Sequence, residues 1–282
     1  MEEAEAPPAP LSPSPLPWTG QPWTRTVTRP PLLGPAIKMA ASDLKVLSFN
    51  LAGGTLFLHS LLPEDKPDIL LIQEVLLSSQ ELLLKVKPYG YNCESNIDIL
   101  NPTKPGTAVI WKEGVPVAET RVIVEGRLQS ITVGTVTFLN IYAPSGSAKR
   151  KEREQMFANE LFQELATAGQ AGLPWLAGDW NCLVQENQTT DNYRDKRSPA
   201  LSDILQNFNY TLFSLLHPAA REYSFNRAGV AQSRLDRVYC PPGHENGLEA
   251  ALHMAGLSDH SGVECRVRLD MRTRPRTPGI KT

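Results

Sequence analysis

Apolar runs of strand length alternate with helical stretches along most of the chain. Short runs of apolar and β-branched residues that end in polar or turn residues are typical of buried strands. Because several runs are apolar at successive positions, we expect the strands to be covered on both faces. The runs predict strands at residues 44–50 (LKVLSFN), 68–74 (DILLIQE), 107–112 (TAVIWK), 135–144 (TVTFLNIYAP), 174–181 (PWLAGDWN), 234–240 (RLDRVYC) and 262–269 (GVECRVRL).

Helical periodicity is clearest in residues 149–168, where Phe157, Leu161 and Leu165 recur at four-residue spacing. This spacing places the three side chains on one face of a helix. We expect that face to be buried. The basic residues at the start of the helix, 149–153, are expected to face solvent, with a contact to phosphate as the alternative.

The order of the elements favours two sheets over one. A second helix is predicted at residues 78–87, begun by a serine cap. Consecutive strands then fill residues 107–143, and the mixed pattern returns after them. Two sheets packed face to face, with helices outside, bury such runs on both faces. The predicted fold class is therefore α/β (α+β), with two packed mixed sheets and outer helices.

Residues 43–270 are predicted to form one folded domain between two tails. Ten of the 24 prolines lie in residues 1–42, beside few aliphatic residues, so we expect a disordered tail there. Residues 271–282 contain four basic residues and no acid, and are expected to be a basic disordered tail. A chain of 282 residues can bury a full core in one large domain.

The predicted domain is negatively charged. The whole chain has a formal charge of −2; residues 1–42 are neutral and residues 271–282 carry +4, which leaves −6 for residues 43–270. This charge disfavours the holding of a polyanion by bulk electrostatics. If the protein binds nucleic acid, the favourable contacts must therefore be local or assisted by a metal ion.

Cysteine usage and the N-terminal segment bear on the compartment. The four cysteines are far apart, and no pair has the spacing of a zinc or redox motif, so we expect a reducing compartment. No apolar run reaches the ~18 residues of a membrane-spanning helix. The acidic, proline-rich start has the character of neither a signal peptide nor a transit peptide. We expect an intracellular protein, in the nucleus or cytoplasm, with no membrane partner.

Polar residues that a core does not need cluster at the ends of the predicted strands. Each alone has a structural explanation, such as a turn, a solvated strand end, a packed aromatic ring or an ion pair. Their joint occurrence, each beside an apolar run, favours a functional site. The residues are Asn50, Glu74, Tyr142, Asp179, Asn181, Asp236, Asp259 and His260.

These residue types suit the hydrolysis of a phosphodiester. Glu74, with Asn50 and Asp259, supplies the hard oxygen ligands that Mg²⁺ (or Mn²⁺) accepts. Asp236 can hydrogen-bond one nitrogen of His260, which fixes the tautomer and leaves the other nitrogen for phosphate or water.

The remaining polar residues have complementary roles in this interpretation. Tyr142 and Asn181 are neutral donors suited to non-bridging phosphate oxygens. Asp179 can orient or deprotonate the attacking water, or protonate the leaving oxygen. A structural alternative is open for Asp179 and Asn181, because both residues also suit a turn.

Several short motifs occur in the order found in one enzyme superfamily. SFN, QE, IYAP, GDWN, SRLDR and SDH resemble the motifs of the endonuclease/exonuclease/phosphatase superfamily over roughly residues 44–269. Within it, LAGDWNCLV, HPAAREYSFNR and SRLDRVYC are most similar to the apurinic-endonuclease-like domain of non-LTR (LINE-type) retrotransposons. The resemblance implies a four-layer α/β/β/α sandwich and a Mg²⁺-dependent nuclease site.

The resemblance also implies roles for individual residues. It assigns metal binding to Glu74 and Asn50, phosphate binding to Tyr142 and Asn181, and catalytic roles to Asp179, Asp236, Asp259 and His260. Two features depart from the family pattern. Val75, Leu76 and Leu77 follow the QE pair, where the family's nucleases often have a polar or basic residue. The sequence also has no reverse transcriptase, so it corresponds to a stand-alone domain or to a fragment.

Three functions are compatible with the sequence. The leading expectation is a Mg²⁺-dependent phosphodiester hydrolase, in particular a DNA endonuclease of the LINE/apurinic type that acts as a monomer on nucleic acid. A phosphatase or phosphodiesterase with a smaller substrate suits the negative charge of residues 43–270 better. A catalytically retired domain kept for binding is the third possibility, and the intact set of polar residues speaks against it.

Overall fold

The computed structural model describes most of the predicted domain. The described residues are 43–54, 58–59, 62, 67–101, 103–169, 172–190, 193–212, 223–225, 232–244, 250–253 and 258–269. The first strand begins at Asp43, where the sequence predicts the start of the domain. The two predicted tails and part of the HPAAREYSFNR motif lie outside the described residues, so the assignments made there stay predictions.

The strands form two six-stranded sheets, each of which contains one parallel pair. The first sheet has the order β11 (Ala250–His253), β12 (Gly262–Arg268), β1 (Asp43–Asn50), β2 (Ile69–Val75), β4 (Gly106–Lys112), β3 (Tyr91–Asn96). The second has the order β5 (Val117–Val124), β6 (Leu128–Val133), β7 (Val136–Tyr142), β8 (Trp175–Asp179), β10 (Asp236–Cys240), β9 (Thr211–Leu212). The parallel pairs are β1 with β2 and β7 with β8.

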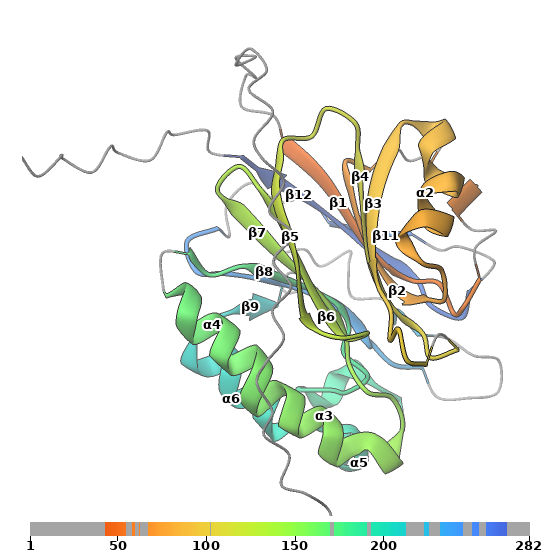
Figure 1. Cartoon of the computed structure of the whole chain (residues 1–282). Helices are drawn as coiled ribbons and strands as arrows, with labels where there is room; N and C mark the ends of the chain where they lie inside the picture. The colour runs from red at the N-terminus through yellow and green to blue at the C-terminus, as the bar shows by residue number, and fades with distance from the viewer. Residues whose placement is uncertain are drawn as a thin grey trace, which may run out of the picture.

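Helices cover the outer face of each sheet (Figure 1). α2 (Ser79–Val86) lies on the first sheet, and Ser78 caps it as predicted, in a reciprocal capping box with Glu81. The second sheet is covered by α3 (Arg150–Met156), a π-helical turn (Phe157–Leu161), α4 (Phe162–Ala168), α5 (Tyr193–Lys196) and α6 (Pro199–Asn207). The layers are helix, sheet, sheet and helix, which confirms the predicted fold class. Within the described ranges, no helix has the length and apolar character that crossing a membrane requires.

Apolar clusters fill the three interfaces between these layers. Between the sheets, Phe138 packs near Trp175, and a separate cluster joins the first sheet to α2. The third cluster, between the second sheet and its helices, contains Phe157, Leu161 and Leu165, all with no exposed surface. The predicted apolar face of this helical segment is therefore confirmed.

The basic start of the same segment is only partly solvated. Arg153 is 2% exposed, and its Nη1 donates to the carbonyl of Pro144 at 2.7 Å. The prediction that residues 149–153 face solvent is therefore wrong at Arg153. The reason is that the loop after β7 brings a carbonyl within reach of a guanidinium, and a buried carbonyl needs a donor.

A buried pair of amides ties the two sheets together next to Glu74. Gln73 Nε2 in β2 donates to Asn140 Oδ1 in β7 at 2.7 Å. Asn140 Nδ2 donates back to the carbonyls of Ile72 and Ala108, at 3.0 and 2.9 Å. Because any slip between the sheets would leave these buried groups unpaired, the bridge fixes the alignment of the two sheets.

Candidate active site

The strand ends bring the predicted residues to one edge of the stacked sheets. Asn50 ends β1, and Glu74 lies one residue before the end of the parallel strand β2. Tyr142 and Asp179 end β7 and β8 and are partners in that parallel pair. Asp236 begins β10, which is antiparallel to β8, directly opposite Asp179. Parallel strands end at the edge where an antiparallel neighbour begins, so this topology gathers polar residues from both sheets.

Asn50 connects the contributions of the two sheets. Its Nδ2 donates to Asp179 Oδ2 at 2.9 Å and to Glu74 Oε1 at 3.2 Å. The hydroxyl of Tyr142 donates to the same Glu74 oxygen at 3.3 Å. Asn50 Oδ1 accepts from the backbone N–H of Ala52 at 2.8 Å. One hydrogen-bonded group therefore contains residues of both sheets.

Both oxygens of Asp179 accept hydrogen bonds from Asn181. The backbone N–H of Asn181 donates to Oδ1 at 3.0 Å, and its Nδ2 donates to Oδ2 at 2.9 Å. The same Nδ2 donates to the carbonyl of Ala143 at 2.9 Å. Asp179 is 1% exposed. In this arrangement Asn181 orients the carboxylate of Asp179 toward the centre of the site.

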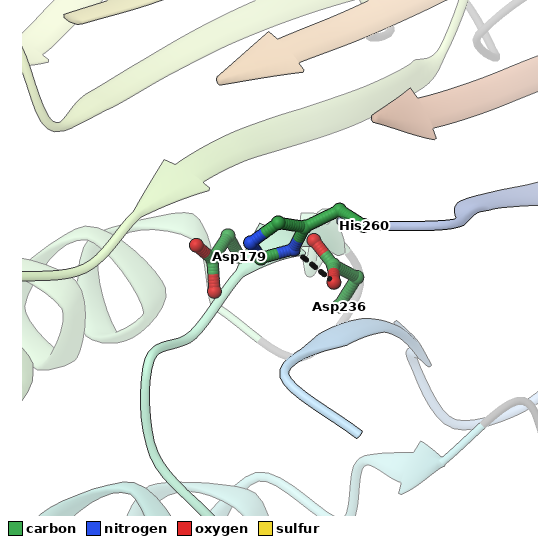
Figure 2. Close-up of side chains that lie close together, drawn as sticks. All are labelled: Asp179, Asp236 and His260. Carbon is green, nitrogen blue, oxygen red and sulfur yellow. Dashed lines mark hydrogen bonds and ion pairs between the residues drawn. The ribbon is translucent and has the colours of Figure 1, made fainter. Parts of the chain in front are cut away.

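His260 lies between two carboxylates (Figure 2). Its Nδ1 is 2.8 Å from Asp236 Oδ2, which is the hydrogen bond that the sequence predicts. Ligand atoms of Asp179, Asp236 and His260 all lie within 4.8 Å of one another. Asp259 Oδ1 lies 4.0 Å from Nε2 of His260. The structure thus brings all of the predicted site residues together.

The mutual charges of this cluster set its protonation. Burial raises the pKa of Asp179, the charge of Asp236 raises it further, and His260 lowers it, to give about 6. For His260, burial lowers the pKa, but Asp236, Asp179 and Asp259 together raise it to about 10. A carboxyl group that changes protonation near neutral pH therefore lies beside an imidazole that stays protonated.

The backbone is strained at several positions of the site. φ is 49° at Ala52, 60° at Glu74 and 47° at Asn181, and Asn209 is the other non-glycine residue with positive φ in the described part of the chain. This left-handed conformation costs roughly 1–2 kcal/mol for a residue with a Cβ. At Glu74 the register between β2 and β4 shifts, and such a bulge re-aims a side chain. Strain concentrated in this way is typical of functional sites.

Arg127 lies beside the predicted site residues, although no pattern in the sequence points to it. It is 6% exposed, and its Cζ lies 4.7 Å from the centre of the Tyr142 ring. Burial and Glu74 raise the pKa of Tyr142, and Arg127 acts against this shift. Arg127 Nε and Nη1 are buried and have no hydrogen-bond partner among the described residues. In the sequence, Glu125-Gly126-Arg127 has only the character of a turn, which gives no signal of burial.

The residues present fit a divalent cation that prefers oxygen ligands. Glu74 offers a partly exposed carboxylate, and Asp236 Oδ1 is buried without a partner among the described residues. Carboxylate oxygens are the ligands that Mg²⁺ favours. Asn50 presents its NH₂ group, not its oxygen, to Glu74, so it becomes a ligand only with its amide turned over. The group Asp179, Asp236 and His260 is less suitable for Mg²⁺, because one of its three ligands is an imidazole nitrogen that already hydrogen-bonds Asp236.

A comparison of the sequence with models of protein families identifies the family of this chain. The model of the Endonuclease/Exonuclease/phosphatase family matches residues 47–260, a range that contains every predicted site residue. The chain therefore belongs to this family. No curated protein matches the chain.

Solved structures of the same fold include several nucleases. An AP endonuclease from Leishmania major has a TM-score of 0.68 at 17% identity, covering 80% of this chain and 88% of that chain. An AP endonuclease from Archaeoglobus fulgidus has a TM-score of 0.66 at 20% identity, covering 79% and 98%. A Neisseria 3′ phosphatase bound to a product DNA hairpin has a TM-score of 0.65 at 19% identity, covering 79% and 99%. At these identities the likeness shows a shared fold.

Proposed function

We propose that this chain is a Mg²⁺-dependent phosphodiester hydrolase that acts on DNA, with Mn²⁺ as the alternative cation. The observation that carries the proposal is the arrangement of His260, which is hydrogen-bonded to Asp236 and lies beside Asp179, while Asn50 joins Asp179 to Glu74. Membership of the Endonuclease/Exonuclease/phosphatase family supports hydrolysis of a phosphate ester. The DNA hairpin bound to the Neisseria structure supports a nucleic acid as substrate.

Glu74, Asp179 and His260 have separate roles in the proposed reaction. A cation held by Glu74, with the oxygen of Asn50 turned toward it, would supply positive charge against the phosphate oxygens. Asp179 is mainly ionised at neutral pH because its pKa is about 6, and it orients the attacking water and accepts its proton. His260 directs Nε2 at a phosphate oxygen, while Asp236 fixes Nδ1.

Two neutral donors complete this assignment. Burial raises the pKa of Tyr142, so its hydroxyl remains protonated and can donate. Before substrate binds, Tyr142 donates to Glu74, and Asn181 donates to Asp179 and Ala143. Phosphate binding requires Tyr142 and Asn181 to exchange one of these internal acceptors for a phosphate oxygen.

We further propose that the DNA substrate is of the kind that LINE-type apurinic endonucleases cleave. The GDWN and SRLDR motifs support this assignment, because they supply Asp179 at the end of β8, Asn181 in the loop after it, and Asp236 at the start of the adjacent strand β10. A duplex with an abasic-site analogue, compared with the same duplex intact, tests whether the missing base raises the cleavage rate.

Glu74→Gln tests the metal role. The change keeps the size of the side chain but removes the charge that a cation needs, so we expect nicking of a supercoiled plasmid to fall by at least about 100-fold. We expect the melting temperature to stay within a few degrees, because the residue is partly exposed and its backbone is unchanged. Nicking is measured with Mg²⁺, with Mn²⁺ and with EDTA.

The matched control is Glu119→Gln, an exposed glutamate of β5, which should nick at the wild-type rate. Full activity of Glu74→Gln at ordinary Mg²⁺ concentration would exclude Glu74 from metal binding. Activity of the wild-type protein in EDTA would remove the cation from the proposal. A wild-type protein that binds DNA but never cleaves it would favour a retired binding domain.

A phosphodiesterase that acts on a smaller substrate is a second candidate. The formal charge of −6 on residues 43–270 favours it, because such a surface attracts a long polyanion poorly. Hydrolysis of bis(p-nitrophenyl) phosphate at a much higher kcat/KM than any DNA substrate would select this candidate.

A further inference from the structure

A buried arginine behind the candidate active site has no role in the proposed reaction. Arg237, the last residue of the SRLDR motif, is 1% exposed. It follows Asp236 in β10 and lies opposite Gly178 of β8. Successive side chains of a strand point to opposite faces of the sheet. Asp236 therefore points into the site, and Arg237 points into the cluster between the second sheet and its helices.

No ion pair between described residues includes Arg237. Its Nη1 donates to Gln188 Oε1 at 3.2 Å and to the carbonyl of Arg234 at 3.3 Å. Its Nε is buried and has no partner in the described part of the chain. Burying a cation that no anion faces is costly. Packing alone does not explain the charge, since an apolar side chain of similar length fills space without this cost.

Arg237 contacts the residues on either side of Asn181. Its Cζ lies 5.8 Å from the centre of the Trp180 ring, and its Nη2 donates to Cys182 Sγ at 3.9 Å. The backbone carbonyl of Arg237 accepts from Trp180 Nε1 at 3.1 Å. Trp180 and Cys182 have no exposed surface. One side chain therefore holds both the residue before Asn181 and the residue after it.

Asn181 needs such a hold because its backbone is strained. Its φ of 47° lies in the left-handed region, which a residue with a Cβ keeps only when its surroundings enforce it. From this conformation Asn181 donates to both carboxylate oxygens of Asp179, at 3.0 and 2.9 Å. If the neighbours of Asn181 were released, the backbone could relax and these two hydrogen bonds would be lost.

Gln188 attaches the following part of the loop to the same guanidinium. Gln188 is 3% exposed, and its Oε1 accepts from the backbone N–H groups of Val184 and Gln185 at 2.9 and 3.1 Å, as well as from Arg237. The loop after β8 is thus fixed to Arg237 at a second point. Because Oε1 retains two donors without Arg237, removing the guanidinium does not leave this oxygen unpaired.

We propose that Arg237 is a positioning residue that holds Asn181 in its strained conformation and so keeps Asp179 and Asn181 aligned for the phosphate. The inference rests on the proposed function and deepens it, because it assigns a role in the reaction to a residue that does not touch the substrate. A residue that only fills the core predicts lower stability when it is replaced. A positioning residue whose buried charge is costly predicts lower turnover without lower stability.

The experiment uses four variants of the full chain: Arg237→Met, Asn181→Ala, the two changes combined, and Ile204→Ala. Ile204 is 2% exposed in the same cluster and serves as the control for weakened packing. Turnover is measured with Mg²⁺ on a duplex and on bis(p-nitrophenyl) phosphate. Hydrogen exchange of single backbone amides is measured by NMR, with the amides of β8 as the internal reference.

We expect Arg237→Met to lower kcat on both substrates at least about tenfold, because small displacements of aligned groups are costly. Its melting temperature should equal or exceed that of the wild type. The Asn181 amide should exchange about tenfold faster, while the amides of β8 remain as slow as in the wild type. Ile204→Ala should melt at a lower temperature and keep the wild-type kcat.

The combined variant shows whether Arg237 acts through Asn181. In the Asn181→Ala background the amide side chain is already absent, so adding Arg237→Met should lower kcat by no more than about threefold. The same factor of loss in both backgrounds would overturn the proposal, because Arg237 would then act independently of Asn181.

Wild-type exchange at Asn181 in Arg237→Met would also overturn the proposal. So would an equal loss of kcat in Ile204→Ala, since any weakening of the core would then lower turnover. A wild-type protein that hydrolyses neither substrate removes the proposed function, whereas faster exchange at Asn181 in Arg237→Met still supports the positioning. If Arg237→Met does not fold, the same measurements on Arg237→Lys, which keeps the charge without the planar fork, decide the question.

Discussion

Asp179 carries a charge at a position where ionisation is costly. Its pKa in the folded protein is about 6, above the ordinary value of 3.8, so the folded state keeps a proton that the unfolded chain releases. Stability therefore falls as the pH rises from about 4 to about 6, and the full cost is present above pH 6. Stability also falls with rising pH because of His260: its raised pKa of about 10 stabilises the fold fully below about pH 6.5, and this stabilisation is lost as the pH rises to about 10.

Asp179→Asn should separate stability from catalysis. We expect turnover to fall at least about 100-fold, because the carboxylate that we propose as the base for the attacking water is lost. We expect the free energy of unfolding to rise by about 1–2 kcal/mol at pH 7.5, and this gain should shrink toward pH 4. Thermal melts at both pH values and nicking rates on one preparation measure the two effects. A stable and fully active variant would leave only the turn explanation for GDWN.

Arg127→Gln tests whether the buried guanidinium acts on the site. Removing its charge beside Tyr142 should lower kcat by roughly 10-fold or more, because less positive charge faces the phosphate. Removing the same charge near Glu74 should lower the Mg²⁺ concentration needed for half-maximal activity. Arg127→Lys should recover part of kcat. A purely structural role predicts a lower melting temperature with unchanged dependence on Mg²⁺.

At the scale of elements, the approach of β7 and β8 depends on Gly178. Its φ is 150°, and a Cβ there would lie 1.9 Å from the carbonyl oxygen of Ile141. Gly178→Ala should therefore cost at least about 2 kcal/mol and reduce activity, because Asp179 follows directly. Gly134→Ala, at a φ of 59° with no heavy atom within 4 Å of the added Cβ, should cost about 1 kcal/mol and leave activity intact. Urea denaturation of both variants measures the difference.

Strands with a long apolar run can be predicted from the sequence. Strands that lack such a run, and that form because they pair with a neighbouring strand, cannot. β3 reads YNCESN, is mostly half-buried and, among the described strands, pairs only with β4, so it shows no apolar run. β9 has two residues, too few for any periodicity. α6 did carry a signal, since Ser198 caps it and Leu201, Ile204 and Leu205 are buried at helical spacing.

At the scale of the whole molecule, charge should limit how strongly binding depends on salt. With −6 on residues 43–270, we expect log affinity for a duplex to fall with log salt at about −0.9 per phosphate, for only a few phosphates. Removing residues 271–282, with their four basic residues, should reduce the slope if that segment contacts DNA. Fluorescence anisotropy from about 50 to 200 mM salt gives the slope. A slope near −10 would show that the surface is far more basic locally than the net charge implies.

The sequence predicts which residues meet at the site better than how they interact. Strand ends could be found from apolar runs, so Asn50, Glu74 and Asp179 could be selected. The direction of the Asn50 amide and the positive φ of Glu74 depend on packing between two sheets, which no local pattern records.

The division of the site between the two sheets has a consequence for folding. Glu74 belongs to one sheet and Asp236 to the other. β1 pairs with β12, although the two strands lie at opposite ends of the domain in the sequence. Contacts so distant in sequence form late, because the chain must first close long loops. After dilution from denaturant, activity should therefore return later than signals of local structure such as helix content. Recovery of activity then marks the completion of folding.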